Sequence, residues 1–391
     1  MKSNLRILFI SDAGDKRGAQ KSLMELMITL RSDHNVTPIL LTKKRNMLND
    51  MCDKLEIENY AFWYREVMKS SPYDIKILNY FKHMISYIFY IIGGIKKKKV
   101  EKVGIDFGNI DLVHTNTNHV DIGCYINKKY GIPHIMHLRE MGIEDFDSVI
   151  YHPNLYSYFN KYVTSFIAIS ECVKRGWIRK GIAEEKIDVI YNGIDVSPYK
   201  ISNKVINDEI KIVVSGAVNK NKGQLDIVKA LSYIPDKIRE KIQVTFYGNT
   251  KFDYLNKIKK YIKNNNLREY VTFEKYTNQL GEELSKNSIG IISSKMEAFG
   301  RVTVEYMLSG LCIIASDTGA NPEIIQDGQN GYLYKYGSPE ELAQCIIKSY
   351  QNKEEVERMR KQAVLEAKEK YTTQINAENI KKLYEKILYE I

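Results

Sequence analysis

The sequence alternates short apolar runs with longer segments of helical pattern, and this alternation restricts the fold more than any other feature. The first series contains "RILFI", "TPILLT", "DLVHT", "PHIMHL" and "SFIAIS", and several of these runs are followed by ten to fifteen residues of helical pattern. After "KIDVIYNGID" the pattern loosens into the polar, proline-containing "VSPYKISNKVINDE", and a second series begins at "IKIVVSGAV". Such alternation is typical of βαβ units around a parallel sheet.

We therefore predict two α/β halves of similar size. A single core stops growing at about 250 to 300 residues, so a chain of 391 residues is expected to form two domains. The expected boundaries are an N-terminal domain over 1–195, a linker over 196–209, a C-terminal domain over 210–370, and a helical segment over 371–391 that can pack back on the first domain. Ligands of such sheets bind beyond the carboxyl ends of the strands, so we expect the site in a cleft between two facing halves.

The composition is that of an ordinary soluble protein, with 44% hydrophobic and 27% charged residues. The cysteines lie far apart, without the spacing of a disulfide framework or a zinc site. They are Cys52, Cys124, Cys172, Cys312 and Cys345. The apolar run at the start is too short for a signal peptide, and no run of about 18 apolar residues indicates a membrane-spanning helix. We therefore expect a cytoplasmic protein.

The net charge is +10, from 58 basic and 48 acidic residues. Such an excess predicts attraction to an anionic partner, which could be a phosphorylated ligand, an anionic membrane surface or nucleic acid. A compositional bias towards Lys, Asn, Ile and Tyr is the alternative explanation.

The segment "MEAFGRVTVEYMLSG" carries two carboxylates, Glu297 and Glu305, eight positions apart. We interpret the preceding "IGIISS" as a buried strand, "KMEAFG" as a turn and "RVTVEYMLSG" as a helix. The backbone N–H groups of Ala298, Phe299 and Gly300 are then expected to form an anion site at the start of the helix, which suits a diphosphate.

The two glutamates are expected on opposite sides of this phosphate position. Glu305 is predicted about two turns into the helix, whereas Glu297 precedes it. One carboxylate can then accept hydrogen bonds from hexose hydroxyls, and the other from ribose hydroxyls, of a nucleotide-sugar. Alternatively, Glu297 is a solvated turn residue and Glu305 is an exposed helix position.

The stretch "EAFGRVTVEYMLSGLCIIASDTGANPEIIQDGQNGYL" resembles the E-x7-E region of family 4 glycosyltransferases. "VIYNGID" is similar to the interdomain segment of that family, and the likeness extends over essentially the whole chain. The resemblance implies the GT-B fold of two facing Rossmann-like domains, and a retaining transfer of sugar from a nucleoside diphosphate. It implies no metal ion and no other cofactor, although residues 145–147, "DFD", look like a metal-binding DxD.

Within this resemblance, "SGAVNKNKGQLDIVKAL" matches the phosphate-binding strand, turn and helix of the family. Gly216 and Lys222 are then expected beside the donor diphosphate, for which an ammonium group is chemically suited. Many relatives have an arginine where this chain has Ala217. By charge and location, Arg301 and Arg17 are the candidates to replace it.

"DAGDKRGAQKSLMEL" resembles the N-terminal glycine loop of the family, which implies that Gly18 lies near the donor phosphates. Arg17 stands where the family usually has a second glycine. "DLVHTNT" resembles a segment that often carries a histidine near the transferred sugar. Asn116 occupies that position here, and it can hydrogen-bond a hydroxyl but carries no charge. Tyr276, in "VTFEKYT", is a candidate contact to the base.

"PHIMHLREMG" supplies His137, Arg139 and Glu140 at the end of a predicted strand. The resemblance implies that these residues recognise hydroxyls or a phosphate of the acceptor. An ion pair that stiffens the loop is the alternative.

The expected function is transfer of a sugar, with UDP-sugar favoured as the donor, to a hydroxyl of a saccharide or lipid-linked acceptor in bacterial surface polysaccharide or capsule synthesis. Lys222 would stabilise the leaving diphosphate, Glu297 and Asn116 would orient the sugar, and Glu305 would hold the donor. A sugar-nucleotide epimerase on the same fold is one alternative, and a non-catalytic protein that binds an anionic ligand or membrane is another. The most specific residues are carboxylates, so no nucleic-acid partner is expected.

"MISYIFYIIGGIKKKK" joins an aromatic, apolar run to Lys96 through Lys99. Such a pairing can lie on an anionic membrane, which would place the protein at the inner face of the cell membrane. A buried helix with a solvated basic end is the alternative.

Overall fold

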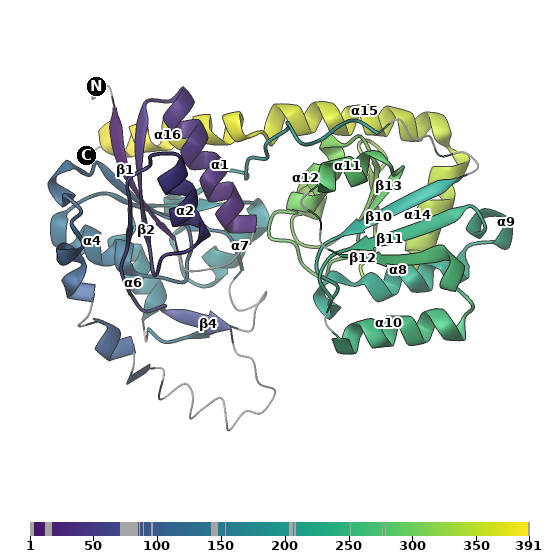
Figure 1. Cartoon of the computed structure of the whole chain (residues 1–391), viewed down its shortest axis with the longest axis horizontal. Coiled ribbons are helices and arrows are strands. Elements are labelled where there is room, and N and C mark those ends of the chain that lie inside the picture. Colours follow the sequence, from purple (N-terminus) through teal and green to yellow (C-terminus); the bar gives the residue numbers. More distant parts are fainter. Residues whose placement is uncertain are drawn as a thin grey trace. The chain divides into compact units, whose positions relative to one another are not determined.

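The computed structural model describes residues 4–11, 18–70, 85, 87–88, 90–94, 97–141, 148–152, 154–202, 206, 209–250, 252–275, 277 and 279–389. The chain forms two compact units (Figure 1). The first unit combines Met1–Gly193 with Thr373–Ile391, and the second consists of Ile194–Thr372. The segment 196–209 therefore belongs to the second unit, and the C-terminal helix belongs to the first.

In the first unit, the described residues form a sheet of seven parallel strands in the order β3-β2-β1-β5-β6-β8-β9. The strands are β1 (Leu5–Ser11), β2 (Val36–Thr42), β3 (Asn59–Ala61), β5 (Leu112–Thr115), β6 (His134–Leu138), β8 (Ser165–Ala168) and β9 (Ile187–Val189). A separate antiparallel pair joins β4 (Met68–Ser70) to β7 (Ser148–Ile150). The described helices include α1 (Gly18–Asp33), α2 (Met47–Lys54), α4 (Ile122–Tyr130), α6 (Leu155–Tyr162), α7 (Glu171–Arg179) and α16 (Thr373–Tyr389).

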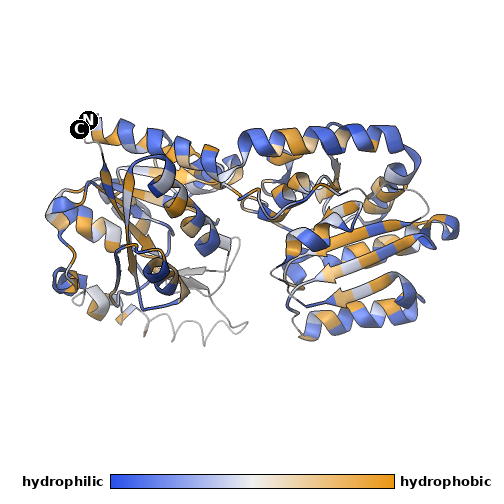
Figure 2. Cartoon of the chain, turned by 45° about the horizontal axis from the view of Figure 1, so that its top comes forward, coloured by the Kyte–Doolittle hydropathy of each residue, from blue (hydrophilic) through white to orange (hydrophobic). Residues whose placement is uncertain are grey.

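Successive residues of β1 enter two different hydrophobic cores. Leu5, Ile7 and Phe9 pack with α1 and α16, whereas Leu8 and Ile10 pack in a core that includes α4. The buried stripe of α16 recurs at helical spacing, at Ala377, Ile380, Leu383, Tyr384 and Ile387. Figure 2 shows the corresponding bands of orange and blue along this helix. Because both faces of a parallel sheet are covered, its strands read as continuous apolar runs.

The described part of the second unit contains a sheet of six parallel strands in the order β12-β11-β10-β13-β14-β15. The strands are β10 (Ile210–Ser215), β11 (Ile242–Tyr247), β12 (Val271–Glu274), β13 (Ile289–Ile292), β14 (Cys312–Ser316) and β15 (Tyr332–Tyr334). The helices are α8 (Gln224–Ala230), α9 (Asp236–Arg239), α10 (Phe252–Asn264), α11 (Leu280–Ser285), α12 (Arg301–Leu308), α13 (Asn321–Ile324), α14 (Pro339–Gln351) and α15 (Lys353–Lys370).

The strand order reverses beside the first strand of each sheet, between β1 and β5 in one unit and between β10 and β13 in the other. Loops that leave the carboxyl ends of the strands diverge at such a point, and the gap between them accepts a ligand. The predicted α/β class with two doubly wound sheets is confirmed, and each sheet has one place where a site is expected.

Candidate active site

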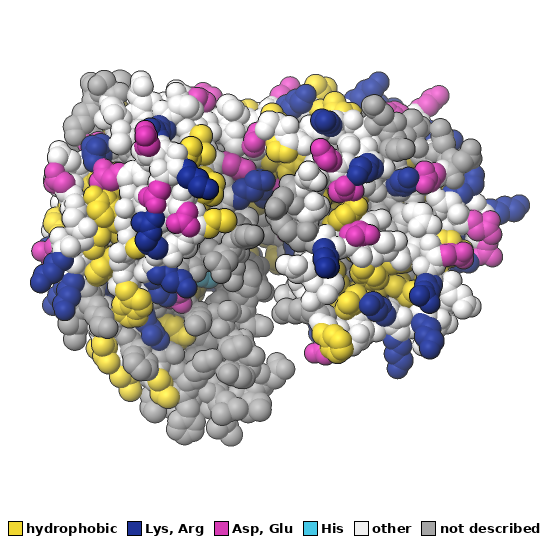
Figure 3. All heavy atoms as spheres, viewed as in Figure 1, with side chains coloured by type: hydrophobic (Ala, Val, Ile, Leu, Met, Phe, Trp, Pro, Cys, Tyr) yellow, Lys and Arg dark blue, Asp and Glu magenta, His cyan; other side chains and the backbone are white. Residues whose placement is uncertain are grey.

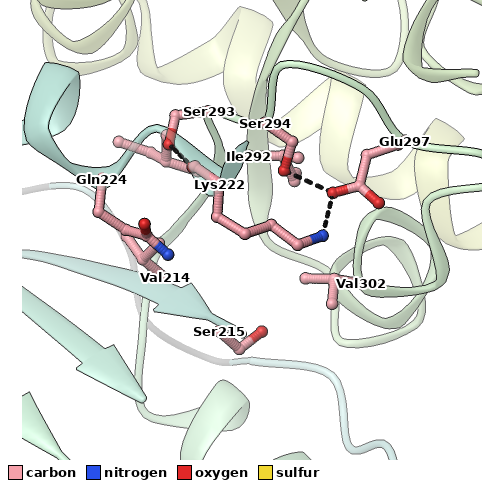
Figure 4. A pocket seen from close by; sticks show the side chains of 10 residues that line it. Val214, Ser215, Lys222, Gln224, Ile292, Ser293, Ser294, Glu297 and Val302 are labelled. Carbon is pink, nitrogen blue, oxygen red and sulfur yellow. Dashed lines mark hydrogen bonds and ion pairs between the residues drawn. The ribbon is translucent and has the colours of Figure 1, made fainter. Parts of the chain in front are cut away.

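A pocket of the second unit lies at the reversal point between β10 and β13. The ends of these two strands, the turn after β10 and the segment between β13 and α12 form its wall (Figure 4). The lining residues are Val214, Ser215, Lys222, Gln224, Ile291, Ile292, Ser293, Ser294, Glu297 and Val302. The pocket thus occupies the position where doubly wound sheets bind their ligands.

Lys222 and Glu297 meet in this pocket. Nζ of Lys222 lies 2.6 Å from Oε1 of Glu297, and the hydroxyl of Ser294 donates to the same oxygen at 2.5 Å (Figure 4). The side chain of Lys222 is 33% exposed and that of Glu297 is 14% exposed. A partly exposed ammonium group can exchange its carboxylate partner for a phosphate, because both are charged hydrogen-bond acceptors.

The turn that carries Lys222 is held against the end of β13. The side chain of Asn219 accepts hydrogen bonds from the backbone N–H groups of Asn221 and Lys222, at 3.0 and 3.3 Å. The hydroxyl of Ser293 donates to the carbonyl of Lys222 at 2.7 Å. Gly223 has a φ of +67°, and a Cβ there would lie 2.0 Å from the carbonyl oxygen of Ser293. Glycine is therefore required for this close approach.

A second glycine supports the backbone of Glu297. Gly319 has a φ of +62°, and a Cβ there would lie 2.4 Å from the carbonyl oxygen of Glu297. The same carbonyl accepts a hydrogen bond from the backbone N–H of Ala320 at 2.8 Å. The loop after β14 thus fixes the backbone of the residue whose carboxylate faces Lys222.

Glu305 and Arg301 form an ion pair on α12. Nε of Arg301 lies 3.2 Å from Oε1 of Glu305, which is buried. The alternative that Glu305 is exposed is therefore wrong. The helix begins at Arg301, as predicted, after Gly300 with its φ of +84°, but the predicted distance of two turns is wrong because Glu305 lies only four positions further on. Glu305 lies about one turn from the helix start.

The remaining predicted residues of the second unit belong to the loops near the pocket. Gly216 directly follows β10 and has a φ of +131°. Phe299 is buried and packs against the ring of Tyr371, with ring centroids 5.9 Å apart. Ala298, next to it, is partly buried.

In the first unit, hydrogen bonds connect the ends of β5 and β6. Buried Arg139 donates from Nε to Oδ1 of Asn116 at 2.8 Å, and from Nη1 to Oδ1 of Asn192 at 2.6 Å. Its Nη2 lies 3.3 Å from Nδ1 of His137, which is also 3.1 Å from Nε2 of His114. Burial, and then the charge of Arg139, lower the pKa of both histidines well below the usual value. Both rings are therefore neutral.

Asn116 is held by the protein at both ends of its amide. Its Oδ1 accepts from Arg139, and its Nδ2 donates to the carbonyl of Ala19 at 3.3 Å, near the start of α1. Gly18 is the first residue of that helix and is exposed. Asn116 thus connects the end of β5 to the start of α1, where Gly18 was predicted to lie near the donor phosphates.

Glu140 interacts with a histidine from the neighbouring loop. Its Oε2 lies 3.3 Å from Nε2 of His119, and its carbonyl accepts a hydrogen bond from the indole N–H of Trp177 at 2.8 Å. Some of the predicted site residues lie outside the described part of the chain: Arg17, Tyr276 and residues 145–147.

The structure therefore brings Lys222 together with Glu297 in the second unit, and Arg139 together with Asn116 and His137 in the first. The structure records separate ion pairs for Glu305, with Arg301, and for Glu140, with His119. The sequence did not single out Ser215, Gln224, Ser293 and Ser294 in the pocket, or His114 and Asn192 in the first unit. For the paired serines a signal existed, because "IGIISS" ends in two hydroxyl side chains at the carboxyl end of a predicted strand.

Two doubly wound parallel sheets, with a lysine and a glutamate paired at the reversal point of the second, define a protein of the GT-B class. The family model "Glycosyltransferase Family 4" matches residues 17–198, and the model "Glycosyl transferases group 1" matches residues 197–365. The chain therefore belongs to the family 4, or group 1, glycosyltransferases, and the predicted membership is confirmed.

Three individual proteins that resemble this chain share 20% to 29% sequence identity with it. Spore coat protein SA of Bacillus subtilis is 29% identical over 229 residues, which cover 52% of this chain and 60% of that protein. The capsular polysaccharide biosynthesis glycosyltransferase CapH of Staphylococcus aureus is 20% identical over 329 residues, 82% of this chain and 84% of CapH. The crystal structure of Anabaena HepE in complex with UDP superposes with a TM-score of 0.79 at 20% identity, covering 98% of this chain and 100% of HepE.

Proposed function

We propose that this protein is a retaining glycosyltransferase that moves a sugar from a UDP-sugar to a hydroxyl of a saccharide or lipid-linked saccharide in surface polysaccharide synthesis. The observation that carries the proposal is the pairing of Lys222 with Glu297 in a pocket at the strand-order reversal. Family membership supports sugar transfer. HepE, solved with UDP, supports a uridine donor, and CapH supports the polysaccharide setting.

The proposed reaction breaks the bond between the anomeric carbon and the diphosphate oxygen and forms a bond from that carbon to the acceptor oxygen on the same face. The acceptor proton passes to the leaving diphosphate. Lys222 places positive charge where negative charge develops, which is the contribution that lowers the barrier most in such sites. Glu297 accepts hydrogen bonds from sugar hydroxyls and so fixes the sugar in the reactive orientation.

The pairing of Lys222 with Glu297 has a consequence for donor binding. When the donor binds, its diphosphate must replace the carboxylate of Glu297 as the partner of the Lys222 ammonium group. The carboxylate then becomes available to the sugar hydroxyls. In this proposal Glu305, held by Arg301, binds the ribose end of the donor. Lys222 and the start of α12 balance the diphosphate charge, so the transfer needs no metal ion.

The proposal predicts a nucleotide-sugar whose affinity depends on Lys222. Lys222→Met should weaken binding of UDP-sugar by about tenfold to a hundredfold, because a hydrogen bond to a charged group contributes about 1.5–3 kcal/mol. Titration calorimetry with a panel of UDP-, GDP- and ADP-sugars measures the effect, with and without a chelator.

Lys348 supplies the matched control, because it also pairs with a glutamate, Glu355, at 3.2 Å in the same unit. Lys348→Met should leave every affinity unchanged. Absence of binding to any nucleotide-sugar would favour the non-catalytic alternative. Conversion of the donor sugar without transfer to an acceptor would favour the epimerase.

The surface of the described residues is of mixed charge on the face shown in Figure 3, where dark blue basic and magenta acidic side chains are interspersed. Such mixing is typical of an ordinary protein surface, whereas a nucleic-acid site concentrates basic residues on one face. On this face, therefore, the described basic side chains do not gather as they do in a nucleic-acid site.

We also propose that the first unit binds an anionic membrane through residues 85–94. The described part of this segment is helical and exposes the large apolar side chains of Ile85, Tyr87, Ile88, Ile91 and Ile92. Exposed Lys98 and Lys99 follow, whereas Lys97 is buried. An exposed apolar helix face beside lysines suits a membrane interface. Among the described residues, no helix is long and apolar enough to span a bilayer.

Replacing two of these isoleucines with glutamate should reduce membrane binding. The double variant Ile88→Glu with Ile91→Glu is expected to lower the fraction of protein that sediments with phosphatidylglycerol vesicles by about tenfold. Each substitution removes an apolar contact with the membrane and adds a negative charge that the anionic lipids repel. Phe252→Glu is the control, because Phe252 is an exposed apolar residue of the second unit. Equal sedimentation of both variants would contradict the assignment.

A further inference from the structure

The C-terminal helix brings a hydroxyl group into the interior of the first unit. The hydroxyl of Tyr384 on α16 lies 2.5 Å from Nδ1 of His114 on β5, and both side chains are fully buried. Burial raises the pKa of Tyr384 well above its usual value, so the hydroxyl keeps its proton. From His114 the contacts continue to His137 and Arg139 at the end of β6.

The charge of Arg139 sets the direction of these hydrogen bonds. A guanidinium group has only donors, so Nδ1 of His137, 3.3 Å from Nη2 of Arg139, must accept. Nε2 of His114 faces the same Nδ1 at 3.1 Å and must donate. Neutral His114 has a single ring proton, so its Nδ1 accepts from the hydroxyl of Tyr384. Neutral His137 likewise has one ring proton, which must lie on Nε2.

That last proton has no recipient in the described part of the chain. Nε2 of His137 has no hydrogen-bond partner there, although the ring is fully buried. Nearly all buried polar groups in proteins are paired, so an isolated one indicates a missing water or ligand. His114 and His137 lie on neighbouring strands, and both stand near the carboxyl edge where the sheet is expected to bind ligands.

We propose that Tyr384 is a positioning residue which, through His114, holds His137 with its Nε2–H available to a hydroxyl oxygen of the acceptor saccharide. The inference rests on the proposed function, because only sugar transfer supplies such an acceptor. A neutral N–H donor suits a neutral hydroxyl oxygen. The amide groups of Asn116 and Asn192, which Arg139 holds nearby, add polar groups to the same edge of the sheet.

Nitrogen-15 NMR of histidine-labelled protein tests the tautomers directly, because protonated and unprotonated ring nitrogens resonate in separate ranges. His114→Gln and His137→Gln variants assign the signals. In the wild-type protein both rings should carry the proton on Nε2. Tyr384→Phe should shift the Nδ1 resonance of His114, whereas Tyr389→Phe, at an exposed position of the same helix, should not. A proton on Nδ1 of His137 in the wild type would overturn the inference.

Steady-state kinetics test the role in acceptor binding. Tyr384→Phe should raise KM for the acceptor by about three- to tenfold, the effect of weakening one hydrogen bond. The affinity for UDP-sugar should change much less, because the pocket that contains Lys222 and Glu297 belongs to the second unit. An unchanged acceptor KM together with a shifted His114 resonance would refute the positioning role. If the wild-type protein transfers no sugar, the proposed function fails, and the NMR result alone decides the tautomers.

Discussion

Replacement of Glu297 by glutamine is expected to lower kcat for sugar transfer by about a hundredfold or more, the usual cost of removing one preorganised polar group from a transition state. The amide keeps the shape of the carboxylate and can still accept from Ser294. It cannot carry the negative charge that strengthens hydrogen bonds from sugar hydroxyls. Because the side chain of Lys222 is one-third exposed, water can solvate its ammonium group in the variant, and the fold should be retained.

Transfer of radiolabelled sugar from UDP-sugar, together with circular dichroism, measures both expectations. Glu355→Gln is the control, because Glu355 pairs with a lysine in the same unit but is not part of the pocket. It should retain full activity. Wild-type kcat in Glu297→Gln would remove this carboxylate from the mechanism, and an unfolded variant would require the test to be repeated with Glu297→Asp.

Removal of the carboxylate of Asp121 is expected to destabilise the first unit by about 3–5 kcal/mol, the usual cost of leaving one member of a buried ion pair alone. Nζ of Lys97 lies 2.5 Å from Oδ2 of Asp121, and the two side chains are 8% and 1% exposed. The hydroxyl of Tyr90 donates to the same oxygen at 3.0 Å. Asp121→Ala would therefore leave a buried ammonium group without its partner.

Urea unfolding followed by tryptophan fluorescence measures this loss in the first unit alone, because both tryptophans of the chain, Trp63 and Trp177, belong to it. The double variant of Lys97→Met and Asp121→Leu should recover most of the stability, since it leaves no unpaired charge. Glu58→Ala is the control, because Glu58 forms an exposed ion pair with Arg6 at 3.1 Å, and its effect should be much smaller. Equal losses in Asp121→Ala and Glu58→Ala would contradict the argument.

Most strands of the two large sheets could be predicted, because a short local run of apolar residues marks them in the sequence. Runs such as "RILFI" and "IKIVVS" are covered on both faces, and their apolar character marks β1 and β10 in the sequence. The antiparallel pair of β4 and β7 could not be predicted in this way, because three residues on each side carry too little periodicity.

Part of the site followed from the sequence for a similar reason. Lys222 and Glu297 each lie in a loop just beyond a strand of the same sheet, so the fold brings them together. The contact between His114 and Tyr384 spans 270 residues, and no local pattern indicates it. Likewise, the four lysines after the apolar run gave no sign that Lys97 would be buried against Asp121.

The division of the first unit between the two ends of the chain affects the order in which the protein can fold during synthesis. A ribosome releases Met1–Gly193 first, but the core around α1 still lacks the apolar stripe of α16. The second unit, a single continuous segment, can complete its core before that helix appears. The core of the first unit therefore stays incomplete, with the apolar faces of β1 and α1 only partly covered, until α16 has been made. Early termination of translation would leave this surface open to aggregation or to chaperones.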